Sequence, residues 1–141
     1  MTKTVSIILV DDDPDEHLLF REDLTDAGVV FDFMAFTKAE DALDHLRERE
    51  PHPVLVLTDL SLAADAALTL IEDSQAFLHG GAIGCYSGTL NPEMDERCRK
   101  RGTSFYIVKP VNREVMLQVV EQTQGIKVSE NADGTVSFVA E

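Results

Sequence analysis

Residues 5–14 have the sequence VSIILVDDDP, in which a run of branched apolar side chains passes directly into three aspartates and a proline. A continuous Val/Ile-rich run is typical of a strand buried on both faces, as in a parallel sheet with helices on either side. Pro14 fits the first position of a helix, and Asp13 can cap that helix through its side chain. The segment therefore predicts a buried strand, an acidic loop and a helix.

This alternation continues along the chain. Further apolar runs at 29–34, 54–57, 82–86 and 105–108 are each followed by a segment with apolar residues at helical spacing. Strands that each precede a helix predict one parallel sheet with right-handed crossovers and helices on both faces. We therefore expect a doubly wound, five-stranded α/β domain of flavodoxin-like type over residues 1–125, with strand order 2-1-3-4-5.

Capping signals set the expected helix ends. Asn91, followed by a proline, predicts the start of the fourth helix, and Gly102 predicts its end. Thr37 and Glu40 have the spacing of a capping box and predict the start of the second helix.

Residues 126–141 depart from the strand–helix alternation. Alternating runs at 126–129 and 135–139 flank the turn-rich insert NADG at 131–134. This pattern predicts a C-terminal β-hairpin extension, with a loose tail as the alternative. Because an isolated hairpin is marginally stable in water, we expect it to pack on the domain or on a second copy in a homodimer.

Length and composition bound the possible functions. The 141 residues, 44% of them apolar, suit a single domain with one core. The net charge of −14 argues against direct binding of nucleic acid. Apolar runs are far shorter than the roughly 20 residues of a membrane span, and no leader peptide is evident, so we expect a cytoplasmic protein without membrane contact. Cys85 and Cys98 lie in different settings and are expected to be reduced.

Polar side chains follow four of the expected strands at their carboxyl ends. Asp11 and Asp12 follow the first strand and Asp59 the third, whereas Ser87 and Lys109 follow the fourth and fifth. Ligands of open α/β sheets bind at this edge, where strand order reverses, so these side chains are expected to converge. Clustered carboxylates repel one another, and oxygen-only ligands with room for water favour Mg²⁺.

This arrangement suits phosphoryl transfer, which depends on positioning and on a positive field around the phosphoryl oxygens. The metal and the Lys109 ammonium would supply that field. Asp59 stands apart from the pair Asp11 and Asp12, and an aspartate can form an acyl phosphate, so Asp59 is the expected nucleophile.

The segments ILVDDDP (8–14), VLTD (56–59), SG (87–88) and VKP (108–110) resemble the signature of receiver domains of two-component response regulators, of the single-domain chemotaxis type. The resemblance covers about residues 5–124. It implies that a histidine kinase or histidine phosphotransfer protein phosphorylates Asp59 in an Mg²⁺-dependent reaction, and that the domain then signals through contacts with a downstream protein. It also implies a phosphoacceptor that assists its own phosphorylation and dephosphorylation rather than an enzyme.

The resemblance implies a role for each matching residue. Asp12 would bind Mg²⁺ directly and Asp11 through water, with Asp59 and the backbone carbonyl of Ser61 completing the protein ligands.

The remaining matches concern the phosphoryl group and the switch. Ser87 and Lys109 would contact the phosphoryl oxygens, and Tyr106 occupies the aromatic switch position. Pro110 is expected to follow a cis peptide bond, which X-Pro bonds allow.

One departure from the family pattern motivates an alternative. Receiver domains usually have a proline and a glycine soon after the phosphoacceptor, where this chain has Ala63 and Ala67. The alternative is a receiver-like protein-binding module that acts without phosphorylation. An Mg²⁺-dependent phosphohydrolase is less favoured, because Ser61 stands where such enzymes place a second aspartate. A flavin-binding domain is disfavoured by the aspartates after the first strand, where a phosphate needs glycines or hydroxyls.

Overall fold

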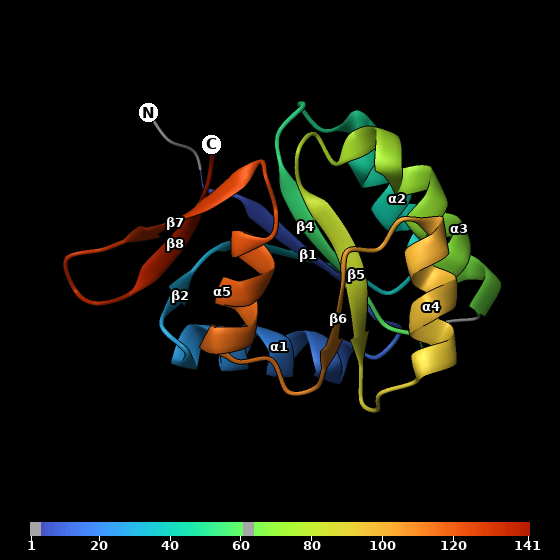
Figure 1. The fold of residues 1–141 in the computed structure, drawn as a ribbon, viewed down its shortest axis with the longest axis horizontal. Coiled ribbons are helices and arrows are strands. Elements are labelled where there is room, and N and C mark those ends of the chain that lie inside the picture. The colour runs from blue at the N-terminus through green and yellow to red at the C-terminus, as the bar shows by residue number, and fades with distance from the viewer. Residues whose placement is uncertain (1–3, 61–63) are drawn as a thin grey trace.

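A five-stranded parallel sheet forms the centre of the protein in a computed structural model that describes residues 4–60 and 64–141 (Figure 1). Its strands are β1 (Ser6–Val10), β3 (Asp32–Phe36), β4 (Val54–Thr58), β5 (Ala82–Ser87) and β6 (Phe105–Val108). They lie in the order β3-β1-β4-β5-β6, and every neighbouring pair is parallel. In chain order of the sheet strands this is 2-1-3-4-5, so the predicted fold is confirmed.

Helices cover both faces of this sheet, and each face has its own apolar cluster. The first face carries α1 (Pro14–Asp26) and α5 (Arg113–Glu121). The second carries α2 (Ala39–Glu48), α3 (Ala64–Ser74) and α4 (Pro92–Arg101), and a short 3₁₀ helix (Gln75–Phe77) follows α3. All residues of β4 are buried, which explains its continuous apolar sequence. None of the helices in the described ranges is long and apolar enough to cross a membrane.

Two of the three predicted helix starts are confirmed. Asp13 caps α1 by accepting from the backbone N of Asp15 at 2.9 Å, and Asn91 caps α4. Gly102, with a φ of 126°, ends α4. The predicted capping box, with Thr37 as the cap residue, is wrong. Helix α2 starts one residue later than predicted, at a cap formed by Lys38, whose side chain makes no capping hydrogen bond among the described residues.

The predicted second strand is in fact two strands that serve different sheets. Val29 and Val30 form β2 (Val29–Val30), whereas β3 begins at Asp32 and pairs with β1. Strand β2 pairs in parallel with β8 (Val136–Ala140) near the C-terminus. A long-range partner thus divides a run that looks continuous in the sequence.

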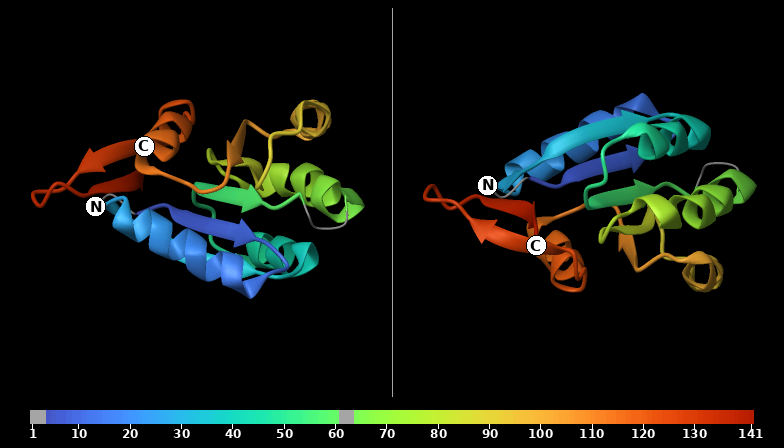
Figure 2. Two further views of the ribbon diagram at one scale, coloured as in Figure 1. Left: turned by 90° about the horizontal axis from the view of Figure 1, so that it is seen from below. Right: turned by 90° about the horizontal axis from the view of Figure 1, so that it is seen from above.

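The C-terminal residues form the predicted hairpin of β7 (Ile126–Glu130) and β8. Together with β2 they make a second sheet of order β2-β8-β7, here called the hairpin sheet, which lies beside α5 at one end of the molecule (Figure 2). The backbone N of Val5 donates to the carbonyl of Phe138 at 2.7 Å, and Phe138 belongs to the apolar cluster of α1 and α5. The hairpin therefore packs on its own domain, and a homodimer stays a prediction.

Both cysteines are free thiols, as expected, and both are buried in the cluster under α2, α3 and α4. Cys98 has charged neighbours in the sequence, but its side chain faces inward from α4 into the same cluster as Cys85. Burial raises the pKa of the Cys85 and Cys98 thiols. These residues are therefore packing groups rather than nucleophiles.

Candidate functional site

An open cleft of about 540 Å³ lies at the carboxyl ends of the central strands. Every predicted site residue within the described ranges lines it. These residues are Asp11, Asp12, Asp59, Ser87, Tyr106 and Lys109. Ser61, whose carbonyl was expected as a metal ligand, lies outside the described residues, as does Ala63. Strands far apart in the sequence thus bring the predicted groups to one place, as the reversal of strand order requires.

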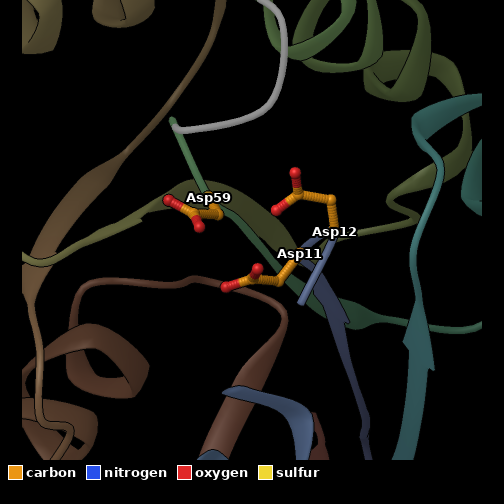
Figure 3. A group of neighbouring side chains, drawn as sticks. All are labelled: Asp11, Asp12 and Asp59. Atoms are coloured by element: carbon orange, nitrogen blue, oxygen red, sulfur yellow. The ribbon is translucent and has the colours of Figure 1, made fainter. Parts of the chain in front are cut away.

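Three carboxylates form the floor of the cleft. Asp11 and Asp12 follow β1 and Asp59 follows β4, and one oxygen from each carboxylate lies within 4.8 Å of the others. Figure 3 shows these side chains, here called the acidic triad, converging from the two strand ends. The backbone N of Asp59 donates to the carbonyl of Val10 at 2.8 Å, which fixes the two strand ends against each other. Asp11 and Asp59 are buried, whereas Asp12 is exposed.

Crowding of this charge is costly to the metal-free protein. Burial, together with the neighbouring Asp59 carboxyl, raises the pKa of Asp11 from 3.8 to about 6, although hydrogen bonds from the backbone N of Asp13 and from Lys109 oppose the rise. A cation within the triad would relieve this repulsion. The donors are all oxygens and one carboxylate is open to solvent, a set that fits a hard divalent cation such as Mg²⁺ with bound water.

Lys109 places its ammonium beside the triad. Its Nζ lies 3.1 Å from Asp11 Oδ2 and 3.5 Å from Asp59 Oδ2. Burial alone would lower the pKa of Lys109, but the hydrogen bond to Asp11 and the charges of both carboxylates outweigh it, so the pKa is raised and the side chain stays charged. The Lys109–Pro110 peptide bond is cis, as expected, and the backbone N of Lys109 donates to the carbonyl of Ser87 at 2.7 Å.

Ser87 and Tyr106 form the rim of the cleft and meet at the loop after β5. The backbone N of Thr89 donates to Ser87 Oγ at 3.4 Å, and the Tyr106 hydroxyl donates to the carbonyl of Thr89 at 2.5 Å. Thr89 therefore links the two side chains. A displacement of Ser87 would therefore shift Thr89, and with it the carbonyl that accepts from the Tyr106 hydroxyl.

Sequence reasoning missed two contacts that α1 makes with the site. Glu16 lies in the first turn of α1, and its Oε2 lies 3.3 Å from Lys109 Nζ. His17 donates from Nε2 to the carbonyl of Asp11 at 2.7 Å. The signal for Glu16 was its position three residues after the cap Asp13, which places it in the first helical turn beside the strand ends.

Comparison with known proteins agrees with this arrangement. The family model described as the response regulator receiver domain matches residues 7–121. No curated protein sequence matches the chain at a significant level.

Solved structures with the same fold include several response regulators. A response regulator from Thermotoga maritima has a TM-score of 0.67 at 22% identity, covering 85% of this chain and 97% of that chain. A response regulator receiver domain from Rhodospirillum rubrum has a TM-score of 0.66 at 27% identity, covering 78% of this chain and 84% of that chain. The chemotaxis protein CheY4 from Vibrio cholerae has a TM-score of 0.66 at 18% identity, covering 86% of this chain and 99% of that chain.

Proposed function

This chain belongs to the response regulator receiver domain family, whose members are signalling modules of two-component systems, and on that premise we propose that Asp59 accepts a phosphoryl group. The donor is a histidine kinase or a histidine phosphotransfer protein. One observation carries the proposal: the buried Asp59 carboxyl lies in an open cleft between two further carboxylates and the ammonium of Lys109. Asp11 also contacts Lys109, at 3.1 Å, but it is paired with Asp12 in the loop after β1, whereas Asp59 stands apart from them at the end of β4.

Mg²⁺ is the proposed cofactor. Asp12 and Asp59 would hold it directly and Asp11 through water, with the carbonyl of Ser61 as a further ligand. When bound, the ion supplies positive charge that offsets the repulsion between the triad and the incoming phosphoryl oxygens.

Transfer follows from the positions of the chain's own groups. A carboxylate oxygen of Asp59 attacks phosphorus as the bond from phosphorus to the donor histidine nitrogen breaks, and that nitrogen leaves with the electron pair. The Lys109 ammonium donates a hydrogen bond to an oxygen of the transferred group and keeps its proton. Its positive charge therefore remains beside the phosphoryl group throughout the reaction. Hydrolysis of the acyl phosphate by water restores the Asp59 carboxylate.

The signal passes from the cleft to the surface through the rim residues. A phosphoryl group on Asp59 adds acceptor oxygens that attract the Ser87 hydroxyl. Thr89 is hydrogen-bonded to both Ser87 and Tyr106, so this movement displaces the Thr89 carbonyl that accepts from the Tyr106 hydroxyl. The surface of α4, β6 and α5 then shifts between two states, and a downstream protein binds one of them.

A second candidate is a receiver-like binding module that acts without phosphorylation. The departure from the family pattern favours it, because Ala63 and Ala67 stand where receiver domains usually have a proline and a glycine. The intact acidic triad and Lys109 favour the phosphoacceptor.

Intact-protein mass after incubation with acetyl phosphate tests the proposal, with and without Mg²⁺ and beside Asp59→Asn. We expect a gain of one phosphoryl group that requires Mg²⁺ and is absent in the variant. If no adduct forms, binding of a beryllofluoride mimic separates a short-lived phosphate from an inactive site. Failure of both would contradict the phosphoacceptor and support the binding module.

A further inference from the structure

We propose that Glu16 is a positioning residue, which holds the Lys109 ammonium against Asp59 from the first turn of α1. The inference rests on the proposed function of Asp59 and extends its site to a residue that the family signature does not include. Glu16 lines the same cleft, and its Oε2 lies 3.3 Å from Lys109 Nζ.

Lys109 has as many donors as it has carboxylate neighbours. An ammonium offers three N–H groups, and the Lys109 Nζ contacts Asp11 at 3.1 Å, Glu16 at 3.3 Å and Asp59 at 3.5 Å. These carboxylates come from the end of β1, from α1 and from the end of β4. The Nζ donates to Asp11 and Asp59, and the Glu16 carboxylate lies within ion-pair distance. A phosphoryl oxygen on Asp59 would replace the Asp59 oxygen as acceptor, while Asp11 and Glu16 hold the ammonium on its other sides.

Glu16 differs from the other two carboxylates in one respect that matters. Asp11 and Asp59 belong to the acidic triad and would share their charge with a bound cation, which weakens their attraction for Lys109. Glu16 is not in the triad, and its side chain is 30% exposed. Its ion pair with Lys109 therefore persists when the cation binds, at the stage when the long, flexible lysine side chain most needs an anchor.

Stabilisation of α1 alone is the competing explanation for Glu16. Acidic residues in a first turn favour the helix dipole, and Asp15 in the same turn supplies this effect equally well. Asp15 is exposed and makes no ion pair with Lys109 within the described part of the chain. Asp15→Ala is therefore a matched control, because it removes the same charge from the same turn without touching Lys109.

The first experiment measures the rate of phosphorylation by acetyl phosphate with saturating Mg²⁺. We expect Glu16→Ala to slow the reaction roughly tenfold through loss of alignment. Glu16→Gln keeps an acceptor oxygen for the ammonium and is expected to retain most of the rate, and Asp15→Ala all of it. In a Lys109→Ala background, Glu16→Ala is expected to have no further effect, since its action passes through Lys109.

A second readout does not depend on phosphorylation. The ¹⁵N relaxation of the Lys109 ammonium reports its mobility, which we expect to rise in Glu16→Ala and to stay low in Glu16→Gln and Asp15→Ala. If the unmodified protein takes up no phosphoryl group, the proposed function fails, and this readout still tests the anchor. An unchanged Lys109 mobility in Glu16→Ala, equal slowing by Glu16→Gln, or equal slowing by Asp15→Ala would each overturn the proposal.

Discussion

The cleft and the hairpin sheet lie at different ends of the domain and are built from opposite kinds of interaction. At the cleft, buried carboxylates crowd together, and the pKa of Asp11 rises to about 6 because burial disfavours its charge. At the hairpin sheet, Ile126, Val136 and Phe138 are buried among apolar side chains of α1 and α5. The cleft thus concentrates buried charge, which destabilises the fold, and the hairpin sheet concentrates apolar contacts, which stabilise it.

This contrast teaches that stability and chemistry are separated in space here. Burial of apolar area stabilises a fold, whereas burial of unneutralised charge opposes it. The hairpin sheet packs beside α5 and anchors the amino-terminal end of β1 through the hydrogen bond from Val5 to Phe138. Substitutions at the two ends should therefore differ in sign as well as in size.

The largest effect is expected from Phe138→Ala at the hairpin sheet. Phe138 is fully buried, and removing a buried aromatic ring costs about 3–5 kcal/mol of unfolding free energy because a cavity remains. Urea denaturation followed by circular dichroism measures the loss, and Ser137→Ala on the same strand, with a half-buried side chain, is the control. A loss below about 1 kcal/mol would mean that the hairpin sheet contributes little to stability.

The next effect concerns the pH dependence of the metal-free protein. Asp11 has a folded-state pKa of about 6, above the usual unfolded value, so the folded state binds more protons between about pH 4 and pH 6. The stability contributed by protonated Asp11 is present below pH 4 and is lost as pH rises through 6. We expect the unfolding free energy to fall by roughly 3 kcal/mol from this group over that range.

Asp11→Asn is the control for this pH dependence, because it removes the titrating group. Measured in EDTA at a series of pH values, the variant should gain stability over the unmodified protein as pH rises from 4 to 7. Parallel stability curves for the two proteins would refute the assigned role of Asp11.

A smaller stabilisation is expected from Mg²⁺ itself. At neutral pH, a Mg²⁺ concentration about 100 times the dissociation constant stabilises by roughly 2.7 kcal/mol if the ion binds only the folded state. Thermal unfolding with Mg²⁺ or EDTA measures this difference. Asp12→Asn should abolish it, whereas Asp133→Asn, in the hairpin turn, should not. Equal loss in both variants would indicate a general charge effect instead of a site.

The sequence predicted the site more completely than it predicted the hairpin's environment. Strand ends of a doubly wound sheet lie at one edge, so Asp11, Asp59 and Lys109 had to converge once the strand order was known. The ion pair of Glu16 with Lys109 was not predicted, because it depends on how a side chain on α1 turns toward the end of β6.

Long-range pairing explains the errors in the fold. The apolar run from Val29 onward gives no sign of its division, because β2 exists through its pairing with β8, more than a hundred residues later in the chain. A propensity pattern reports the local preference of a segment and not its partner. The hairpin itself was visible because its turn carries a local signal, which ends at Gly134.

The smallest effect is expected at that turn, where Gly134 has a φ of 89°. Its backbone N donates to the carbonyl of Asn131 at 3.1 Å, and its carbonyl accepts from Arg113 Nη1 at 3.2 Å, so the conformation also ties the turn to α5. A Cβ at Gly134 would meet nothing within 4 Å, so Gly134→Ala should cost only the strain of a positive φ, about 1 kcal/mol. Asparagine tolerates this region better, so Gly134→Asn should cost less than Gly134→Ala in the same urea experiment.

Gly88→Ala at the cleft, which also meets nothing within 4 Å and has no positive φ, is the matched control and should change stability little. If alanine costs as much at Gly88 as at Gly134, backbone conformation is not what distinguishes the turn of the hairpin sheet from the loop of the cleft.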